Sequence, residues 1–394
     1  MRRVYLDYAG SAPVDPRVLR EMKPFLMKPG NPSALHEDGQ TAKRRIEEAR
    51  QILAHLINAD NPDGVIFTSG ATEANNLAIL GMGERLKTKG NHIISSNIEH
   101  ISLINPLKKL EKEGFEVTRV PVDNQGLIDV ASLESAVKDN TVMISVQAAN
   151  SEIGVVQPIE EIGRIAAERD IVFHSDATAA LGQIPIDVKK SNIGLLTMSS
   201  NSIYGPHGVG ALFLAPHIRP VPQIIGGGQQ RGFRSGTENV AGIIGMGAAA
   251  KLVIMEMSTD VERLKGFRNR LIKELPDKIR DVHLNGHAVK RTPNNANFRI
   301  DYIEGESIVL SLDIIAGISA STGASCASLT LEPSHVVLAL GVPPEKAQGL
   351  LQLTMGRFTR EDDISRVIDS LPSIVERLRR MSPLTPGNYF RKEG

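Results

Sequence analysis

Short apolar runs rich in β-branched residues alternate along this chain with longer stretches of helical spacing. The strand-like runs are GVIFTSG (64–70), HIISS (92–96), FEVTRVPVD (115–123), TVMISVQ (141–147), IVFHSD (171–176), LLTMSS (195–200) and GVGALFL (208–214). Between them, segments such as IEEIGRIAAERD (159–170) place their isoleucines on one helix face. This alternation predicts right-handed crossovers and a mainly parallel sheet covered by helices on both faces. Ligands of such sheets bind beyond the carboxyl ends of the strands.

The pattern changes after about residue 236. We expect a long apolar helix at 240–257 and a charged helix at 260–275, followed by a strand at 296–300 and a helix at 305–313. The last expected elements are a strand at 350–355 and an amphipathic helix at 361–380. A chain of 394 residues also exceeds the usual length of one domain. We therefore predict a large α/β domain over residues 15–257 and a smaller α+β domain built from residues 1–14 and 258–394.

Composition and charge exclude several classes of partner. Lys plus Arg equals Asp plus Glu at 45 each, so no net charge attracts nucleic acid or an anionic membrane. The N-terminal stretch has no apolar segment of signal-peptide length, and the apolar run at 240–250 is too short to span a bilayer. We expect a cytoplasmic protein without nucleic-acid or membrane partners. Its one cysteine, Cys326, excludes an internal disulfide and any all-cysteine or Cys/His zinc motif.

The first polar cluster is TSGATEANN (68–76), where a predicted strand gives way to a predicted helix. The amides of Gly70, Ala71 and Thr72 then stand at the positive end of the helix, which suits a phosphate group. An ordinary helix start capped by Ser69 or Thr72 is the alternative.

Two further residues follow predicted strands. Asp176, in HSDAT, is placed where a carboxylate can keep the nitrogen of a heterocyclic cofactor protonated, although such aspartates also serve as caps and in turns. His100, in NIEHISL, can stack on a planar cofactor or move protons, and the alternative is a surface or capping residue.

Three glycine- and serine-rich stretches complete the set of candidates. SSNSIYGPHGVGAL (199–212) and GGGQQRGFRSGTEN (226–239) read as oxyanion-binding loops or as simple turns, and neither has the context of a dinucleotide or Walker motif. Cys326 lies in SASTGASCASLTLEPSH (319–335), whose composition predicts an exposed loop and hence a nucleophile or sulfur carrier. A buried structural thiol is the alternative.

Taken in order, these stretches resemble the cysteine desulfurases that supply iron–sulfur cluster assembly, pyridoxal 5'-phosphate (PLP) enzymes of the class V aminotransferase family. The resemblance runs through YLDYAGSAP, GNPSALHEDG, FTSGATEANNLAI, EH at 99–100, QAANSEIGVVQPI, HSDATAALGQ, SSNSIYGPHGVGAL, GGGQQRGFRSGTEN, PNNANF, STGASC and GRF. It implies PLP fold type I: a large α/β domain whose mainly parallel sheet is sandwiched by helices, plus a smaller α+β C-terminal domain carrying the cysteine loop.

The resemblance also implies a cofactor site. Its residues are Ala71, Thr72, His100, Asn150, Asp176, Ser199, Asn201 and Thr237. By this resemblance, the phosphate is bound by Ala71, Thr72 and Ser199 together with Thr237 of a second subunit. The resemblance therefore implies a homodimer. His100 stacks on the ring, Asp176 pairs with its nitrogen and Asn150 lies on its hydroxyl side. Cys326 attacks the substrate sulfur and, with His100, is a candidate catalytic residue.

Three departures from the family pattern surround the same ring. Where the family has Ser, any residue, His and Lys before Tyr-Gly-Pro, this chain has Ser199, Ser200, Asn201 and Ser202, so the lysine that forms the Schiff base is absent. Serine can neither form an imine nor act as a strong base at neutral pH. The family glutamine that supports the ring hydroxyl falls at Ala179, and the arginine that clamps the substrate carboxylate falls at Gln352. The chain thus resembles archaeal members that lack the lysine.

These observations leave two functions open. The first is a cysteine desulfurase that converts L-cysteine to L-alanine and holds the sulfur as a persulfide on Cys326, weakly because Ser202 replaces the lysine. The second is a non-catalytic dimer that holds PLP non-covalently and acts as a persulfide carrier, with sulfide as the sulfur source. In that role Cys326 would also be a metal ligand of a [2Fe-2S] cluster shared with the scaffold protein, since a lone thiolate cannot hold one. A lyase acting on selenocysteine or another amino acid has no separate support.

Overall fold

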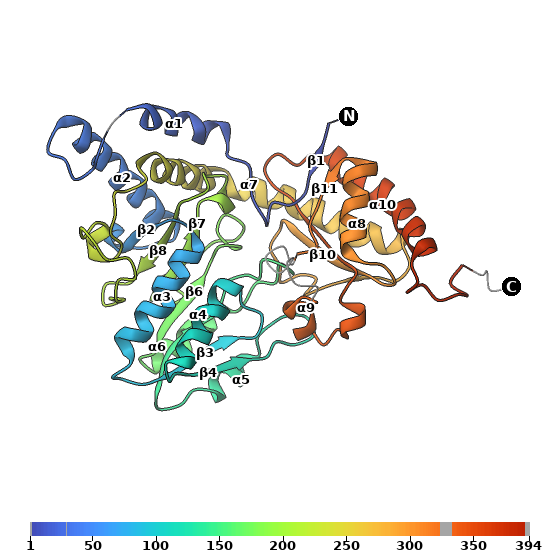
Figure 1. The fold of residues 1–394 in the computed structure, drawn as a ribbon, viewed down its shortest axis with the longest axis horizontal. Coiled ribbons are helices and arrows are strands. Elements are labelled where there is room, and N and C mark those ends of the chain that lie inside the picture. The colour runs from blue at the N-terminus through green and yellow to red at the C-terminus, as the bar shows by residue number, and fades with distance from the viewer. Residues whose placement is uncertain (1, 29, 324–332, 391–394) are drawn as a thin grey trace.

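Seven strands form a mainly parallel sheet in the computed structural model, which describes residues 2–28, 30–323 and 333–390 (Figure 1). In spatial order the strands are β2 (Val65–Thr68), β8 (Gly210–Leu214), β7 (Leu195–Ser199), β6 (Val172–Asp176), β5 (Thr141–Ser145), β3 (His92–Ser96) and β4 (Glu116–Val120). β8 pairs antiparallel with β2 and β7, and the other neighbours pair in parallel. The strands predicted from the apolar runs are confirmed, as is the α/β fold.

Helices cover both faces of this sheet because successive strand residues point to opposite sides. Ile93 packs with α3 (Ala71–Leu86) and α4 (Ile101–Lys112), while Ile94 packs on the other face. On that other face lie α1 (Pro16–Met27), α2 (Glu37–Leu56), α5 (Val130–Ser135), α6 (Ile159–Glu168) and the start of α7 (Val240–Lys278). Strands such as β3 and β5 are buried throughout, which explains why apolar and polar residues do not alternate along them.

A second core forms around a three-stranded antiparallel sheet of order β12–β10–β9. Its elements are β9 (Val282–Leu284), β10 (Asn295–Ile300), α8 (Gly305–Ser311), β12 (Leu350–Thr354) and α10 (Glu361–Met381). The short helix α9 (His335–Ala339) packs outside this core, through Val336 against Ile153. The N-terminal strand β1 (Val4–Tyr5) pairs with β11 (Ile318–Ser319), which brings Val4 and Leu6 into this core. The division into domains at residues 15–257, 1–14 and 258–394 stays a proposal, which these two cores support.

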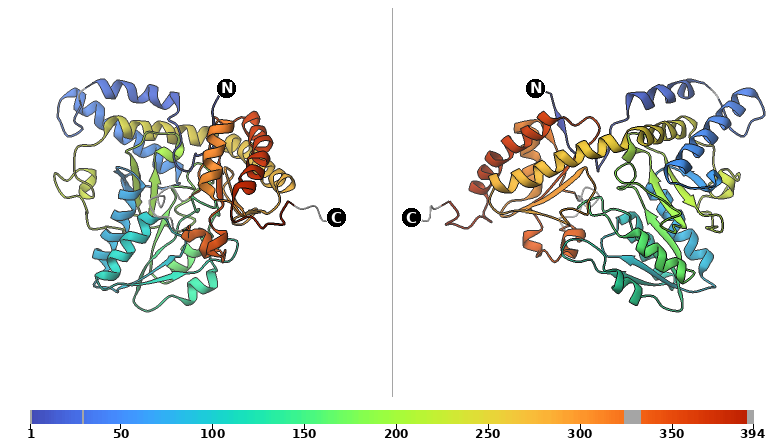
Figure 2. Two further views of the ribbon diagram at one scale, coloured as in Figure 1. Left: turned by 45° about the vertical axis from the view of Figure 1, so that its right-hand side comes forward. Right: turned by 180° about the vertical axis from the view of Figure 1, so that it is seen from behind.

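The helix α7 joins the two cores and corrects one prediction. Two helices were expected, at 240–257 and 260–275, but the structure has one helix of 39 residues. No glycine or proline interrupts it at 258–260, so the helix continues from the first core, through Val253, into the second, through Leu264. Figure 2 shows it running between the two lobes. It is also long and apolar enough to cross a membrane, but 56% of its most apolar window is buried, as in a core helix.

Candidate active site

The start of α3 is shaped for an anion. β2 ends at Thr68, and Gly70 occupies the N-cap of α3 with φ 155°, a conformation that favours glycine. No side chain caps this helix, so the alternative of a cap by Ser69 or Thr72 is wrong. The strand β8 presses against the turn, because a Cβ on Gly210 would lie 2.6 Å from the carbonyl carbon of Gly70. Uncapped amides at a helix start can bind a phosphate group.

Asp176 and His100 lie at the same edge of the sheet, and two residues that the sequence reasoning missed connect them. Asp176 ends β6, is 6% exposed, and accepts hydrogen bonds from Asn75 Nδ2 at 2.8 Å and from the backbone N–H of Thr178 at 2.8 Å. Asn75 Nδ2 also donates to Ser102 Oγ, which lies 2.7 Å from His100 Nδ1. Asn75 belongs to the quoted stretch TEANN, but nothing in the sequence showed that it faces Asp176.

His100 is the N-cap of α4. Its Nδ1 accepts a hydrogen bond from the backbone N–H of Ser102 at 3.1 Å, so the capping alternative is correct. Burial lowers the pKa of the His100 ring, the nearby Asp176 carboxylate opposes that shift, and His335 adds to it. The preceding residue, Glu99, is wholly buried, and burial raises its pKa to about 8 although Ser96 and the amide of Gln147 donate to it.

A cavity of about 60 Å³ lies beside Ser202. Its walls include Asn150, Thr178, Asn201 and Asn295, which come from both cores. The described residues that line it include no lysine, arginine, histidine, aspartate or glutamate. No amine therefore takes the place of the missing lysine in this wall.

Ser202 sits in a turn that is tied to the rest of the molecule. Its Oγ donates to the carbonyl of Ser199 at 2.9 Å, and Ser199 Oγ donates to Asn201 Oδ1. Tyr204 follows in a left-handed conformation, φ 67°, and its hydroxyl accepts from the backbone N–H of Arg357 at 2.9 Å. The Arg357 guanidinium lies over the Tyr204 ring, 4.5 Å from its centroid. This turn cannot shift without disturbing that contact.

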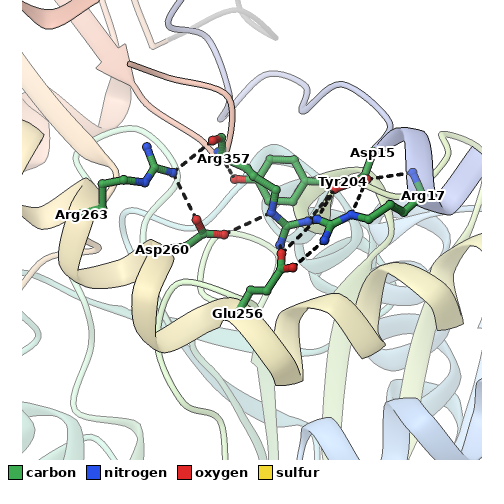
Figure 3. Close-up of polar contacts among 7 residues, drawn as sticks. All are labelled: Asp15, Arg17, Tyr204, Glu256, Asp260, Arg263 and Arg357. Carbon is green, nitrogen blue, oxygen red and sulfur yellow. Dashed lines mark hydrogen bonds and ion pairs between the residues drawn. The ribbon is translucent and has the colours of Figure 1, made fainter. Parts of the chain in front are cut away.

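Arg357 is the centre of a network of ion pairs that joins the two cores (Figure 3). Its guanidinium contacts Asp15 at 2.9 Å, Asp260 at 3.1 Å and Glu256 at 3.4 Å. Arg17 pairs with Asp15 and Glu256 from the other side. Two of these carboxylates belong to α7, so the network holds the Ser202 turn, the N-terminal segment and the GRF stretch around one helix.

The side-chain amide of Gln352 makes its hydrogen bonds to the protein backbone. Its Nε2 donates to the carbonyls of Ser151 at 2.6 Å and Glu152 at 2.7 Å, and the residue is 2% exposed. Both amide hydrogens are thereby occupied, so Gln352 offers a substrate carboxylate no free donor. Asn150 has a similar duty: its Nδ2 donates to Ile98, and its Oδ1 accepts two backbone amides. One N–H of Asn150 remains for a ligand.

The remaining candidates are not brought to this edge of the sheet by a described contact. Thr237 is exposed in the segment before α7, and within this chain no described contact joins it to Asp176 or His100. Cys326 lies outside the described residues. Among the residues that are described, no group of three or more His, Cys, Asp or Glu side chains could hold a metal ion.

The donor set at this edge fits PLP. Uncapped helix amides suit its phosphate, and the buried Asp176 suits a protonated ring nitrogen. Thr178 Oγ1 is buried without a hydrogen-bond partner in the described part of the chain, as expected where a polar ligand binds. Because no amine among the described residues lines the cavity, these residues would hold the cofactor by non-covalent contacts.

Comparisons with known proteins identify the family of the chain. The aminotransferase class-V family model matches residues 4–367. The chain is 51% identical over 381 residues to cysteine desulfurase IscS 1 of Archaeoglobus fulgidus, covering 96% of this chain and 99% of that protein. A solved structure described as a NifS-like protein has a TM-score of 0.89 at 31% identity over 96% of this chain and 100% of the other. Another, described as SspA in complex with cysteine, has a TM-score of 0.80 at 34% identity over 91% and 100%.

Proposed function

The chain belongs to the class V aminotransferase family, and from that premise we propose that it is a PLP-dependent cysteine desulfurase supplying sulfur for iron–sulfur cluster assembly. L-Cysteine becomes L-alanine, and its sulfur passes to the Cys326 thiol as a persulfide. The observation that carries this proposal is the convergence of the uncapped α3 amides, Asp176 and His100 at one sheet edge. Similarity over nearly the whole chain to a curated cysteine desulfurase, and to a solved structure described as a complex with cysteine, supports it.

The residues of this chain divide the work of binding. Ala71, Thr72 and Ser199 would hold the phosphate, with Thr237 of a second copy, so we propose a homodimer. Asp176 and His100 would hold the ring, and Asn150 would hold its hydroxyl side. When bound, PLP supplies an electron sink for bonds broken at the substrate's α-carbon.

Proton transfer is where this chain departs from a fully active desulfurase. Ser202 has no amine, and its hydroxyl is already bound to the carbonyl of Ser199. The cavity wall has no charged described residue, and Gln352 is occupied by backbone carbonyls. Without a positioned base, a reaction loses about 100- to 10,000-fold in rate. We therefore propose weak turnover.

A lysine restored at position 202 tests this proposal. Ser202→Lys should raise L-alanine formation from L-cysteine by about 100-fold or more. Ser202→Met is the matched control, since its side chain is of comparable length but has no amine. The reasoning is refuted if the methionine variant gains as much as the lysine variant. It also fails if the unaltered protein forms no L-alanine above the rate of free PLP.

The neutral cavity favours a second function in that last case. The dimer would then hold PLP non-covalently and use the Cys326 thiolate to ligate a [2Fe-2S] cluster shared with a scaffold protein, whose bridging sulfides need no change of oxidation state. The other ligands must come from the scaffold. Anaerobic reconstitution with iron, sulfide and the scaffold should then give charge-transfer absorption that Cys326→Ala abolishes. Equal absorption from the variant and the unaltered protein would exclude the role of this thiol.

A further inference from the structure

Asn75 and Ser102 link Asp176 to His100 without belonging to the proposed cofactor contacts. Asn75, on α3, is completely buried, and Ser102, in the first turn of α4, is 7% exposed. Asn75 Nδ2 donates to Asp176 Oδ2 at 2.8 Å and to Ser102 Oγ at 2.9 Å, so both of its amide hydrogens are used. Asn75 Oδ1 has no hydrogen-bond partner in the described part of the chain.

The direction of each hydrogen bond in this chain follows from chemistry. An ionised carboxylate can only accept, so the amide nitrogen of Asn75 must face Asp176. Ser102 Oγ accepts from the same nitrogen, which leaves its own hydrogen for His100 Nδ1 at 2.7 Å. The backbone N–H of Ser102 points to the same ring nitrogen and can only donate. Two donors thus converge on Nδ1, which must present a lone pair.

We infer that Asn75 and Ser102 are positioning residues that hold His100 as the neutral tautomer whose proton is on Nε2. In this state the Nε2 of His100 can donate a hydrogen bond but cannot accept a proton, because that nitrogen already carries one. Protonation at Nδ1 would break the hydrogen bond from the backbone N–H of Ser102, which caps α4, and would force the Ser102 hydroxyl to turn its hydrogen away. His100 is therefore not the base that replaces the missing lysine.

This inference deepens the proposed function, since it explains why turnover is weak, and it rests on that function only in assigning His100 to the active site. In the described part of the chain, the charged and titratable groups around the ring are Asp176 at the end of β6, His335 on α9 and the preceding Glu99. Asp176 favours an imidazolium, and burial and His335 oppose it. The hydrogen bonds to Nδ1 act in the same direction as burial.

The test uses the cofactor-free full chain labelled with ¹⁵N in its histidine rings, so it can fail while the proposed activity stands. His100→Gln assigns the His100 signals among the ten histidines by their loss. Long-range ¹H–¹⁵N correlation spectra should show an unprotonated Nδ1 and a protonated Nε2 at neutral pH. The opposite tautomer, or rapid exchange between the two, overturns the inference.

A pH titration of the same signals tests the roles of the two residues. Ser102→Ala removes one hydrogen bond to Nδ1 and should raise the pKa of His100 by about 0.5–1 unit, the size of one net hydrogen bond. Ser102→Thr keeps the hydroxyl and should restore the unaltered value. Asn75→Leu removes the hydrogen bond that orients the Ser102 hydroxyl. It should therefore raise the pKa of His100, as Ser102→Ala does.

Matched controls separate positioning from general loosening. Ser95 is a completely buried serine on β3 whose Oγ donates to the Ser145 carbonyl at 2.9 Å, and it makes no hydrogen bond to Asn75, Ser102 or His100 among the described residues. Asn76, next to Asn75, donates to the Thr72 carbonyl. Ser95→Ala and Asn76→Leu should leave the His100 pKa unchanged. If the control variants shift the His100 pKa as much as the test variants do, Asn75 and Ser102 are merely structural and the inference is wrong. If a test variant does not fold, the tautomer of His100 in the unaltered protein still decides the question.

Discussion

Replacing Arg357 by alanine should destabilise the protein more than any loss of a surface ion pair. The side chains of Arg357 and Asp15 are 9% and 2% exposed, and their atoms lie 2.9 Å apart. Breaking a buried pair by removing one partner costs about 3–5 kcal/mol, because the other charge stays buried. Asp15 keeps Arg17 at 2.8 Å, which places the expected loss near the lower end, about 3 kcal/mol. The contact with the Tyr204 ring is part of that figure, since neighbouring interactions do not add.

The assay is urea unfolding followed by circular dichroism at neutral pH and one protein concentration. Arg164→Ala is the matched control: Arg164 pairs with Glu168 at 2.7 Å, but both side chains are 55% exposed. Exposed pairs of this kind contribute little to stability, because water and salt screen them. Arg357→Lys should fall between the two variants, because lysine keeps the charge but not the planar fork that meets several carboxylates. Equal losses for Arg357→Ala and Arg164→Ala would refute the role of the network.

Three further results are expected. Burial would raise the pKa of Asp15, but hydrogen bonds from Arg17 and Arg357 outweigh burial and hold this pKa well below its usual range. The ionised Asp15 carboxylate should therefore stabilise the protein fully above about pH 4 and lose this effect on further acidification, and Asp15→Asn should flatten the acid side of the curve of stability against pH. Glu99 has the opposite effect: its pKa is raised from 4.5 to about 8, so the stability of the protein falls as the pH rises between these values, by up to about 1.4 kcal/mol per pH unit. Glu99→Gln should remove this pH dependence in thermal melts. Gly210→Ala should lower the free energy of unfolding by about 1–3 kcal/mol and weaken PLP binding, because the added Cβ would meet Gly70. The control is Gly266→Ala, in an exposed turn of α7 with no neighbour within 4 Å, which should stabilise the protein by about 0.5–1 kcal/mol. Similar effects of the two variants would contradict the close approach of Gly210 to Gly70.

The layered fold was predictable because its signal is local. Residues such as Ile93 and Ile94 are both apolar and adjacent, as expected where each faces a different helical layer. Asp176 and Ser199 each end a strand, and Ala71 lies three residues after one, where the rule for parallel sheets places ligand sites. The continuity of α7 through 258–260 was missed, because tertiary contacts at both ends extend a helix whose polar middle favours a break.

Sequence alone determined which chemical groups this protein has: a glycine at the start of α3, a carboxylate at the end of β6, one thiol, and a serine where an amine was expected. Only the tertiary structure decided what those groups are free to do. Gln352 meets two backbone carbonyls from a distant segment, and Asn75 meets Asp176 and Ser102 from separate elements. A hydrogen bond has a direction that depends on both partners, and partners far apart in sequence are matched only when the chain folds.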